Sequence, residues 1–195
     1  VLFRSNELHN ARTVDDISKA IEGIILQAHR HNPDMDIIAQ YLYDMPYVES
    51  YRKGITPWQI AALDRISLQY GINAIDQARQ VTNWFDSGKI SEKEFGGCHP
   101  KPAGHKAYGD MIDRLFDTAW AGPVQPSTKP HHGGRRYDPN SYEFAHFQSI
   151  DSAKVKSGWK KVENWQGTGK GSVRKHDKGL DYLEATEPGA ELTVE

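Results

Sequence analysis

A histidine in a glycine-rich loop is the residue of this sequence best suited to acid–base chemistry. His99 follows Gly96 and Gly97, which allow tight backbone geometry, and precedes Pro100, which stiffens the chain. A helix is predicted directly after it, and an imidazole near a helix N-terminus is favoured in its neutral, proton-accepting form. These features suit a general base in the hydrolysis of a carboxylic ester. The alternative is a loop histidine that only caps the following helix.

The elements predicted around His99 alternate between helices and strands. Apolar residues recur at helical spacing in residues 13–31, 56–70, 76–87 and 102–120. Thr13 and Thr56 are predicted N-caps of the first two of these helices. Residues 36–42 are near-continuously apolar, as in a strand buried on both faces, and residues 72–75 form a second short strand. Strands that alternate with helices predict a parallel sheet, and two strands are too few, so further strands are expected before Asn6.

The ends and the local composition of the chain predict its division into parts. Residues 1–5 resemble the in-frame translation of a common sequencing adapter and are interpreted as a non-native scar. Residues 6–121 hold the alternating helices and strands, and residues 122–140 form a linker rich in proline and glycine. Residues 141–195 contain tryptophans and short apolar runs separated by glycines, which predicts a partial all-β module. The alternating pattern at its end suggests a chain that stops within a strand.

The segment around His99 resembles the last conserved block of SGNH hydrolases, also called GDSL-like lipases or acylhydrolases. The similarity lies in residues 97–100 (Gly-Cys-His-Pro), in Gly104 and in the amphipathic helix that follows. The resemblance implies that His99 is the base of a catalytic triad. It also implies that Asn6 is the oxyanion-hole asparagine, whose side-chain N–H binds the oxyanion. The implied fold is a flavodoxin-like, three-layer α/β/α domain, N-terminally truncated, with residues 6–121 as its C-terminal half.

Two departures from the family pattern bear on activity. The family has an aspartate three residues before the histidine, where this sequence has Gly96, and Glu94 is the nearest acid. The family's nucleophile is a serine in a Gly-Asp-Ser-like loop, and Gly-Asp-Ser does not occur in this sequence. Ser5 would lie in the oxyanion block and is rejected as the nucleophile. We therefore expect the chain as given to be catalytically inactive and its full-length parent to be an ester hydrolase.

Similarity to a bacterial subgroup of this family, linked to polysaccharide breakdown, extends to residues 32–37, 70–72 and 187–193. It implies acyl esters on carbohydrates as substrates, and secretion or a periplasmic location. We expect no cofactor and no metal. The alternative is a non-catalytic carbohydrate-associated module that kept the fold without a full triad, and Gly96 favours this alternative. A nucleotide-binding domain is disfavoured because the sequence has no phosphate loop.

Composition limits the remaining function classes. The 195 residues have a formal net charge of -2, so no overall charge attracts nucleic acid or an acidic membrane surface. The longest apolar runs are only a few residues long, so we expect no membrane-spanning segment. The one cysteine, Cys98, cannot form an internal disulfide. The expected partner is a small-molecule or polysaccharide ester, and the sequence leaves the oligomeric state and the compartment open.

Overall fold

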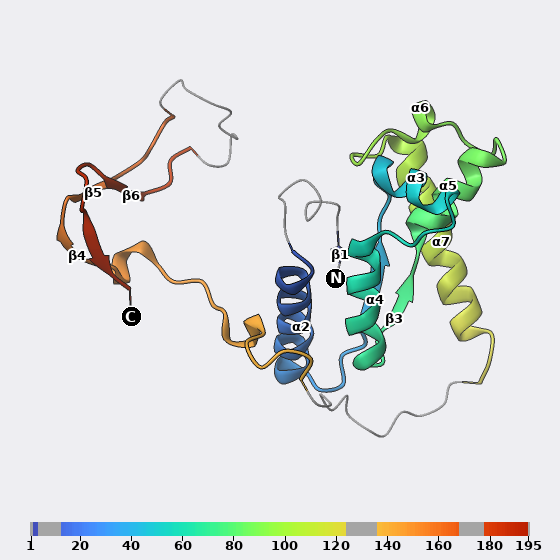
Figure 1. The fold of residues 1–195 in the computed structure, drawn as a ribbon, viewed down its shortest axis with the longest axis horizontal. Helices are drawn as coiled ribbons and strands as arrows, with labels where there is room; N and C mark the ends of the chain where they lie inside the picture. Colours follow the sequence, from blue (N-terminus) through green and yellow to red (C-terminus); the bar gives the residue numbers. More distant parts are fainter. Residues whose placement is uncertain (1, 4–12, 124–135, 168–177, 195) are drawn as a thin grey trace. The chain divides into compact units, whose positions relative to one another are not determined.

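The computed structural model describes residues 2–3, 13–123, 136–167 and 178–194 (Figure 1). The chain divides into two compact units, Val1–Ala145 and His146–Glu195. Helices and strands are both present, so the protein is mixed α/β, as the alternating pattern predicts. The division between the units falls after Ala145, whereas the composition of the chain places the start of the β-rich module at residue 141.

The first unit contains a three-stranded parallel sheet. Its strands, in spatial order, are β1 (Leu2–Phe3), β2 (Ile38–Tyr41) and β3 (Asn73–Ile75). Leu2 lies opposite Gln40, and Ile38 lies opposite Asn73. The two strands predicted from their apolar runs are therefore confirmed, and so is their parallel pairing. β1 lies within residues 1–5, which the sequence pattern assigns to a scar.

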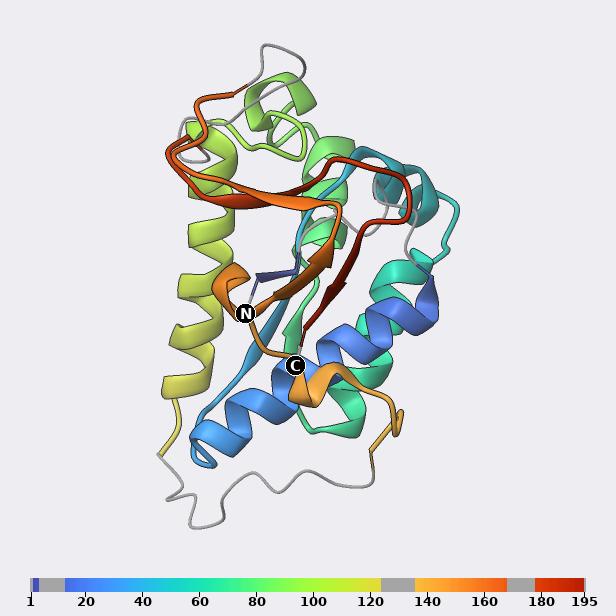
Figure 2. The same cartoon turned by 90° about the vertical axis from the view of Figure 1, so that its left-hand side faces the viewer.

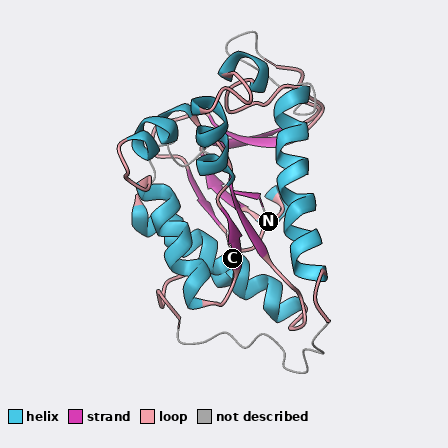
Figure 3. Ribbon diagram, turned by 90° about the vertical axis from the view of Figure 1, so that its right-hand side faces the viewer, coloured by secondary structure: helices cyan, strands magenta, loops and turns pink. Residues whose placement is uncertain are grey.

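Helices lie on opposite sides of these strands. Figures 2 and 3 show the strands between α7 (Pro102–Trp120) on one side and α2 (Val14–His31) with α4 (Trp58–Gln69) on the other. The α2 and α4 side is filled by a buried apolar cluster, which includes Ile17, Ile21, Ile25, Ala39, Tyr41, Ile60, Leu63 and Ile66. A second cluster joins the remaining helices and consists of Tyr43, Val48, Val81, Phe95, Ala107 and Met111.

α2 begins and ends where its sequence predicts. The hydroxyl of Thr13 accepts a hydrogen bond from the backbone N–H of Asp16 at 3.1 Å, and the Asp16 carboxylate accepts from the backbone N–H of Thr13 at 3.1 Å. This capping box satisfies N–H groups that the first helical turn leaves without partners. The helix ends at His31, because Asn32 precedes a proline and takes an extended conformation.

The helix predicted over residues 56–70 forms as α4, but its cap differs from the prediction. Pro57 is the N-cap residue and no side chain caps the helix. The predicted cap was wrong because the Thr56 hydroxyl instead accepts a hydrogen bond from Nη2 of Arg79 at 3.4 Å. The predicted end is confirmed: Gly71 follows the helix with φ 64°, the left-handed conformation that favours glycine.

The remaining helices of the first unit are short or follow a strand directly. α5 (Gln77–Asp86) matches its predicted range, and Asp76 caps it by accepting from the backbone N–H of Arg79 at 2.9 Å. α3 (Met45–Arg52) follows β2, with Asp44 as its N-cap. α6 (Glu92–Phe95) lies in the segment that the sequence pattern treats as a loop.

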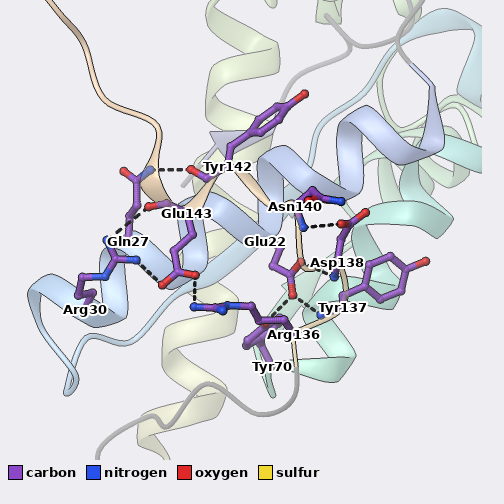
Figure 4. Close-up of polar contacts among 10 residues, drawn as sticks. All are labelled: Glu22, Gln27, Arg30, Tyr70, Arg136, Tyr137, Asp138, Asn140, Tyr142 and Glu143. Atoms are coloured by element: carbon purple, nitrogen blue, oxygen red, sulfur yellow. Dashed lines mark hydrogen bonds and ion pairs between the residues drawn. The ribbon is translucent and has the colours of Figure 1, made fainter. Parts of the chain in front are cut away.

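Residues 136–145 pack along α2, as Figure 4 shows. Nε2 of Gln27 donates to the backbone oxygens of Tyr142, at 2.9 Å, and Ala145, at 3.1 Å. Glu143 forms ion pairs with Arg30 and with Arg136, the latter at 2.6 Å. This segment includes the end of the predicted linker and the start of the predicted β module. Its contacts instead join it to the first unit.

A buried carboxylate holds the same segment. Glu22 of α2 is fully buried and accepts hydrogen bonds from the Tyr70 hydroxyl at 2.5 Å, from the backbone N–H of Asp138 at 2.8 Å, and from that of Tyr137 (Figure 4). A buried carboxylate is costly unless such donors surround it. The chain also passes close to α2 at Gly23, where an added Cβ would lie 2.6 Å from the carbonyl carbon of Tyr142.

The second unit is built from short antiparallel strands. β4 (Lys154–Ser157) pairs with β7 (Glu191–Thr193), and β5 (Trp159–Val162) pairs with β6 (Tyr182–Ala185). The ring of Trp165 packs edge-on against that of Tyr182, with centroids 5.7 Å apart. Among residues 146–167 and 178–194, no apolar side chain reaches full burial. A 3₁₀ turn at Ile150–Ser152 precedes the first of these strands.

In the described part of the chain, no helix combines the length and the apolar character needed to cross a membrane.

Candidate active site around His99

Two acidic residues follow the strands of the parallel sheet at their carboxyl ends. Asp44, almost fully buried, lies three residues after β2, and its Oδ1 accepts from the backbone N–H of Met45 at 2.8 Å. Asp76 follows β3 directly, and its Oδ2 accepts from the Tyr51 hydroxyl at 2.7 Å. In α/β folds, ligands bind outside the carboxyl ends of parallel strands. This edge of the sheet is therefore the natural place for a site in the first unit.

The loop of His99 is closed at its base by a short hydrogen bond. The backbone N–H of Lys101 donates to the carbonyl oxygen of Phe95 at 2.7 Å. The end of α6 and the start of α7 therefore lie next to each other. Nζ of Lys101 also donates to the backbone oxygen of Lys93 at 2.9 Å. Pro102 occupies the first turn of α7, where its missing N–H leaves no helical bond unmade.

An aromatic cluster anchors this loop in the core. Phe95 is fully buried, and its ring centroid lies 5.0 Å from that of Tyr43, 5.7 Å from that of Phe85 and 5.4 Å from that of Tyr108. The rings meet edge to face, the arrangement favoured by their charge distribution. Since Phe95 immediately precedes Gly96, the start of the loop is held against Tyr43, two residues after the end of β2.

A hydrogen bond joins α7 to the carboxyl end of β2. The hydroxyl oxygen of Tyr108 accepts from the backbone N–H of Tyr43 at 2.9 Å. Burial raises the pKa of Tyr43 to about 12, with a smaller contribution from the negative charge of Glu92. Burial likewise raises the pKa of Tyr108 well above its usual value, so both phenols stay neutral at physiological pH. The start of α7, and with it the loop of His99, is therefore fixed to the carboxyl edge of the sheet.

Two glycines make this close packing possible. Gly104 lies where an added Cβ would be 2.5 Å from the carbonyl oxygen of Phe95 and 2.7 Å from Cβ of Pro100. Gly96 has φ 90°, a conformation that residues with a side chain rarely adopt, and a Cβ there would lie 2.7 Å from the backbone nitrogen of Lys101. The loop in this conformation therefore has no room for an aspartate at position 96.

Glu94, the nearest acid in the sequence, is engaged elsewhere. Its carboxylate accepts from the hydroxyl of Ser91 at 2.6 Å and from the Ser91 backbone N–H at 2.9 Å, forming the capping box of α6. The hydrogen bond from the Ser91 hydroxyl lowers the pKa of Glu94, and the N–H bond lowers it further. Glu94 thus stabilises the start of α6.

His99 itself lies exposed at the tip of the anchored loop. Its ring makes no hydrogen bond or ion pair with any residue in the described ranges. Cys98, beside it, is also exposed and carries a free thiol. An exposed imidazole on a rigid loop is accessible to a proton donor from a substrate or from another segment of polypeptide.

The structure bears differently on Asn6, on Tyr41 at the end of β2, and on possible metal ligands. Asn6, the predicted oxyanion donor, lies outside the described residues, so its position relative to His99 is not defined. Tyr41 belongs to the buried cluster against α4, where its hydroxyl donates to Oδ1 of Asp64 at 3.2 Å. Tyr41 therefore packs in the core. No group of histidine, cysteine, aspartate or glutamate side chains in the described ranges could hold a metal ion.

The aromatic anchor was not predicted from the sequence. Its members come from separate elements, namely the segment after β2, α5, α6 and α7. A local signal existed for two of them: Phe95 directly precedes the paired glycines, and Tyr108 lies one helical turn after Gly104. Their convergence on Tyr43 required the fold.

Comparison with known proteins gives no relative for this chain: no protein-family model, curated protein or solved structure matches it.

Proposed function

We propose that this chain carries the base-bearing part of an SGNH-type ester hydrolase, with a flavodoxin-like α/β/α fold. Its substrates are carboxylic esters, with acyl groups on carbohydrates as the favoured class. One observation carries the proposal: the loop of His99 is tied to the carboxyl edge of the parallel sheet by the bond between Tyr108 and Tyr43 and by the ring of Phe95. That edge is where such folds bind ligands.

The proposed reaction is acyl transfer through a serine. The His99 imidazole takes the proton of the serine hydroxyl while the serine oxygen bonds to the ester carbonyl carbon. Asn6 is proposed to donate a hydrogen bond to the resulting oxyanion. His99 then gives its proton to the departing alkoxide, and water cleaves the acyl-enzyme by the same two proton transfers. Gly-Asp-Ser is not in this sequence. The proposal therefore requires a serine from outside these 195 residues.

Hydrolysis of p-nitrophenyl acetate tests the proposal. Protein extended with its upstream coding sequence is expected to hydrolyse this ester, and His99→Ala is expected to lower kcat at least about a thousandfold. The matched control is His105→Ala, which removes an exposed imidazole from the first turns of α7 and should leave kcat unchanged. The 195-residue chain alone is expected to show no His99-dependent hydrolysis. Activity that persists in the extended His99→Ala protein would remove His99 from the reaction.

A second candidate, a carbohydrate-associated module without catalysis, is favoured by the geometry of position 96. Gly96 has positive φ and no space for a side chain, and Glu94 is held by Ser91, so neither supplies the acid that orients a triad histidine. Under this alternative the extended protein binds polysaccharide without hydrolysing esters. Polysaccharide pull-down and ester hydrolysis, both measured on the extended parent protein and on its His99→Ala variant, separate the two candidate functions. Binding without hydrolysis in both proteins supports only the non-catalytic module.

A further inference from the structure

A cavity of about 400 Å³ lies where the carboxyl end of β3 meets α5 and α7. Residues of the His99 loop do not line it, so the cavity is separate from the proposed ester-hydrolase site. Its volume falls within the range of small-molecule binding sites. The side chains around it combine an apolar wall with charged groups, and the pairing of those charges decides which ligand suits it.

The two acids of the cavity already have ion-pair partners. Asp76 accepts from the Tyr51 hydroxyl at 2.7 Å and pairs with Nε of Arg79 at 3.2 Å. Asp110 pairs with Nζ of Lys106 at 2.7 Å, one turn earlier on α7. Neither carboxylate therefore needs a cation from a ligand.

The two cations of the cavity have no such partners. Neither Arg114 nor Lys89 forms an ion pair with any carboxylate among the described residues. The ammonium of Lys89 instead lies 3.7 Å from the ring centroid of Trp84, a cation–π contact. The side-chain amide of Gln80 adds a donor that is likewise uncommitted within the described ranges. The balance of free groups favours an anionic ligand.

The apolar part of the cavity suits a ring or a short hydrocarbon. Ile75 ends β3, Met111 is buried on α7, and the half-buried Trp84 presents its ring from α5. Small-molecule sites combine such apolar walls with a few polar groups that fix orientation. A guanidinium such as that of Arg114 binds a carboxylate through two parallel hydrogen bonds.

We propose that this cavity binds a small organic carboxylate with a ring-shaped or apolar body. Arg114 and Lys89 hold the carboxylate, Gln80 donates to it, and Ile75, Trp84 and Met111 contact the body of the ligand.

Benzoate binding, followed by ligand-observed saturation-transfer NMR on the 195-residue protein, tests this assignment. Benzamide is the neutral control of the same shape. Arg114→Gln and Lys89→Gln should each weaken benzoate binding at least about fivefold, since each removes a charged hydrogen-bond donor that is partly screened by solvent. Lys53→Gln is the matched control, because it removes an exposed lysine that is not among the residues lining the cavity.

The assignment predicts saturation transfer to benzoate, little to benzamide, and normal binding in the Lys53→Gln and His99→Ala proteins. It is overturned if the parent protein gives no transfer to millimolar benzoate, or if benzamide binds equally well. Unchanged binding in both the Arg114→Gln and Lys89→Gln proteins also overturns it. A loss of binding in His99→Ala would place the benzoate at the other site and equally contradict the proposal.

Discussion

Replacing Gly104 by alanine tests whether α7 is packed against the His99 loop as closely as the structure indicates. The added Cβ would lie 2.5 Å from the carbonyl oxygen of Phe95 and 2.7 Å from Cβ of Pro100. Both partners are rigid, one a backbone atom and the other part of a ring, so neither can move aside alone. α7 must shift away from the loop, or the loop must open.

A second glycine of the same helix supplies the control. Gly109 has nothing within 4 Å of its added Cβ. In a helix interior, alanine is more stable than glycine by about 1 kcal/mol, so Gly109→Ala should stabilise the protein by up to that amount. Gly104 lies in the first turn of α7, so Gly104→Ala receives at most this gain and also the overpacking penalty, typically about 1–3 kcal/mol. The difference between the two variants therefore isolates the contact with the loop.

Urea unfolding followed by circular dichroism measures both variants. The free energy of unfolding should be lower in Gly104→Ala than in Gly109→Ala by about 1–3 kcal/mol. With slopes of about 1–3 kcal/mol per molar urea, the two midpoints should differ by roughly 1 M. Equal midpoints, or a more stable Gly104→Ala protein, would show that α7 does not rest on Phe95 and Pro100.

Three further predictions concern buried polar groups. Tyr108→Phe leaves the backbone N–H of Tyr43 without its acceptor and should destabilise the protein by about 1–3 kcal/mol in urea unfolding, whereas Tyr142→Phe at an exposed ring should change it by less than about 0.5 kcal/mol. Glu22→Gln places an amide NH2 group against N–H and O–H groups that now donate to the carboxylate, so it should lower the free energy of unfolding by about 3 kcal/mol. It should also speed amide hydrogen exchange in residues 136–145, and unchanged exchange would contradict this. Burial raises the pKa of several tyrosines above the value of about 10 in the unfolded chain, so folding favours their neutral form. Their contribution to the free energy of unfolding is complete below about pH 10 and is lost as the pH rises through their pKa values in the folded protein. Circular dichroism should therefore show alkaline unfolding above about pH 10, and a fold unaffected up to about pH 12 would refute the burial of Tyr41, Tyr43, Tyr51, Tyr70 and Tyr108.

The elements with strong local signals were predictable from the sequence. α2 has a capping box at Thr13 and a proline after Asn32, so both of its ends follow from nearby residues, and Pro102 marks the start of α7. α3 was missed although Asp44 caps it and Tyr47, Val48 and Tyr51 are buried on it. With only eight residues, its apolar period is too short to stand out.

The contacts between distant segments were not predictable. Residues 136–140 have the composition of a linker, and their partner, Glu22, lies more than a hundred residues earlier in the chain. A carboxylate on a helix shows no local sign that backbone N–H groups from another segment will surround it. These contacts place residues 136–145 with the first unit, whereas the composition of the chain indicates a linker up to residue 140.

One part of the candidate site could be predicted from local sequence, and another part depends on contacts between distant segments. The exposed loop of His99 and the helix after it follow from local glycines and prolines. The attachment of that loop to the sheet depends on Tyr43, Phe85 and Tyr108, which come from three different segments. Only the folded chain shows that they meet at Phe95.

Determining the coding sequence upstream of Asn6 tests the central claim most directly. The account predicts a strand followed by a Gly-Asp-Ser loop, and then a turn that ends in glycine and one further residue before Asn6. That result would supply the serine from which His99 takes a proton. An upstream region without such a serine, or a start codon directly before Val1, would leave His99 without a nucleophile and would contradict the proposed ester hydrolysis.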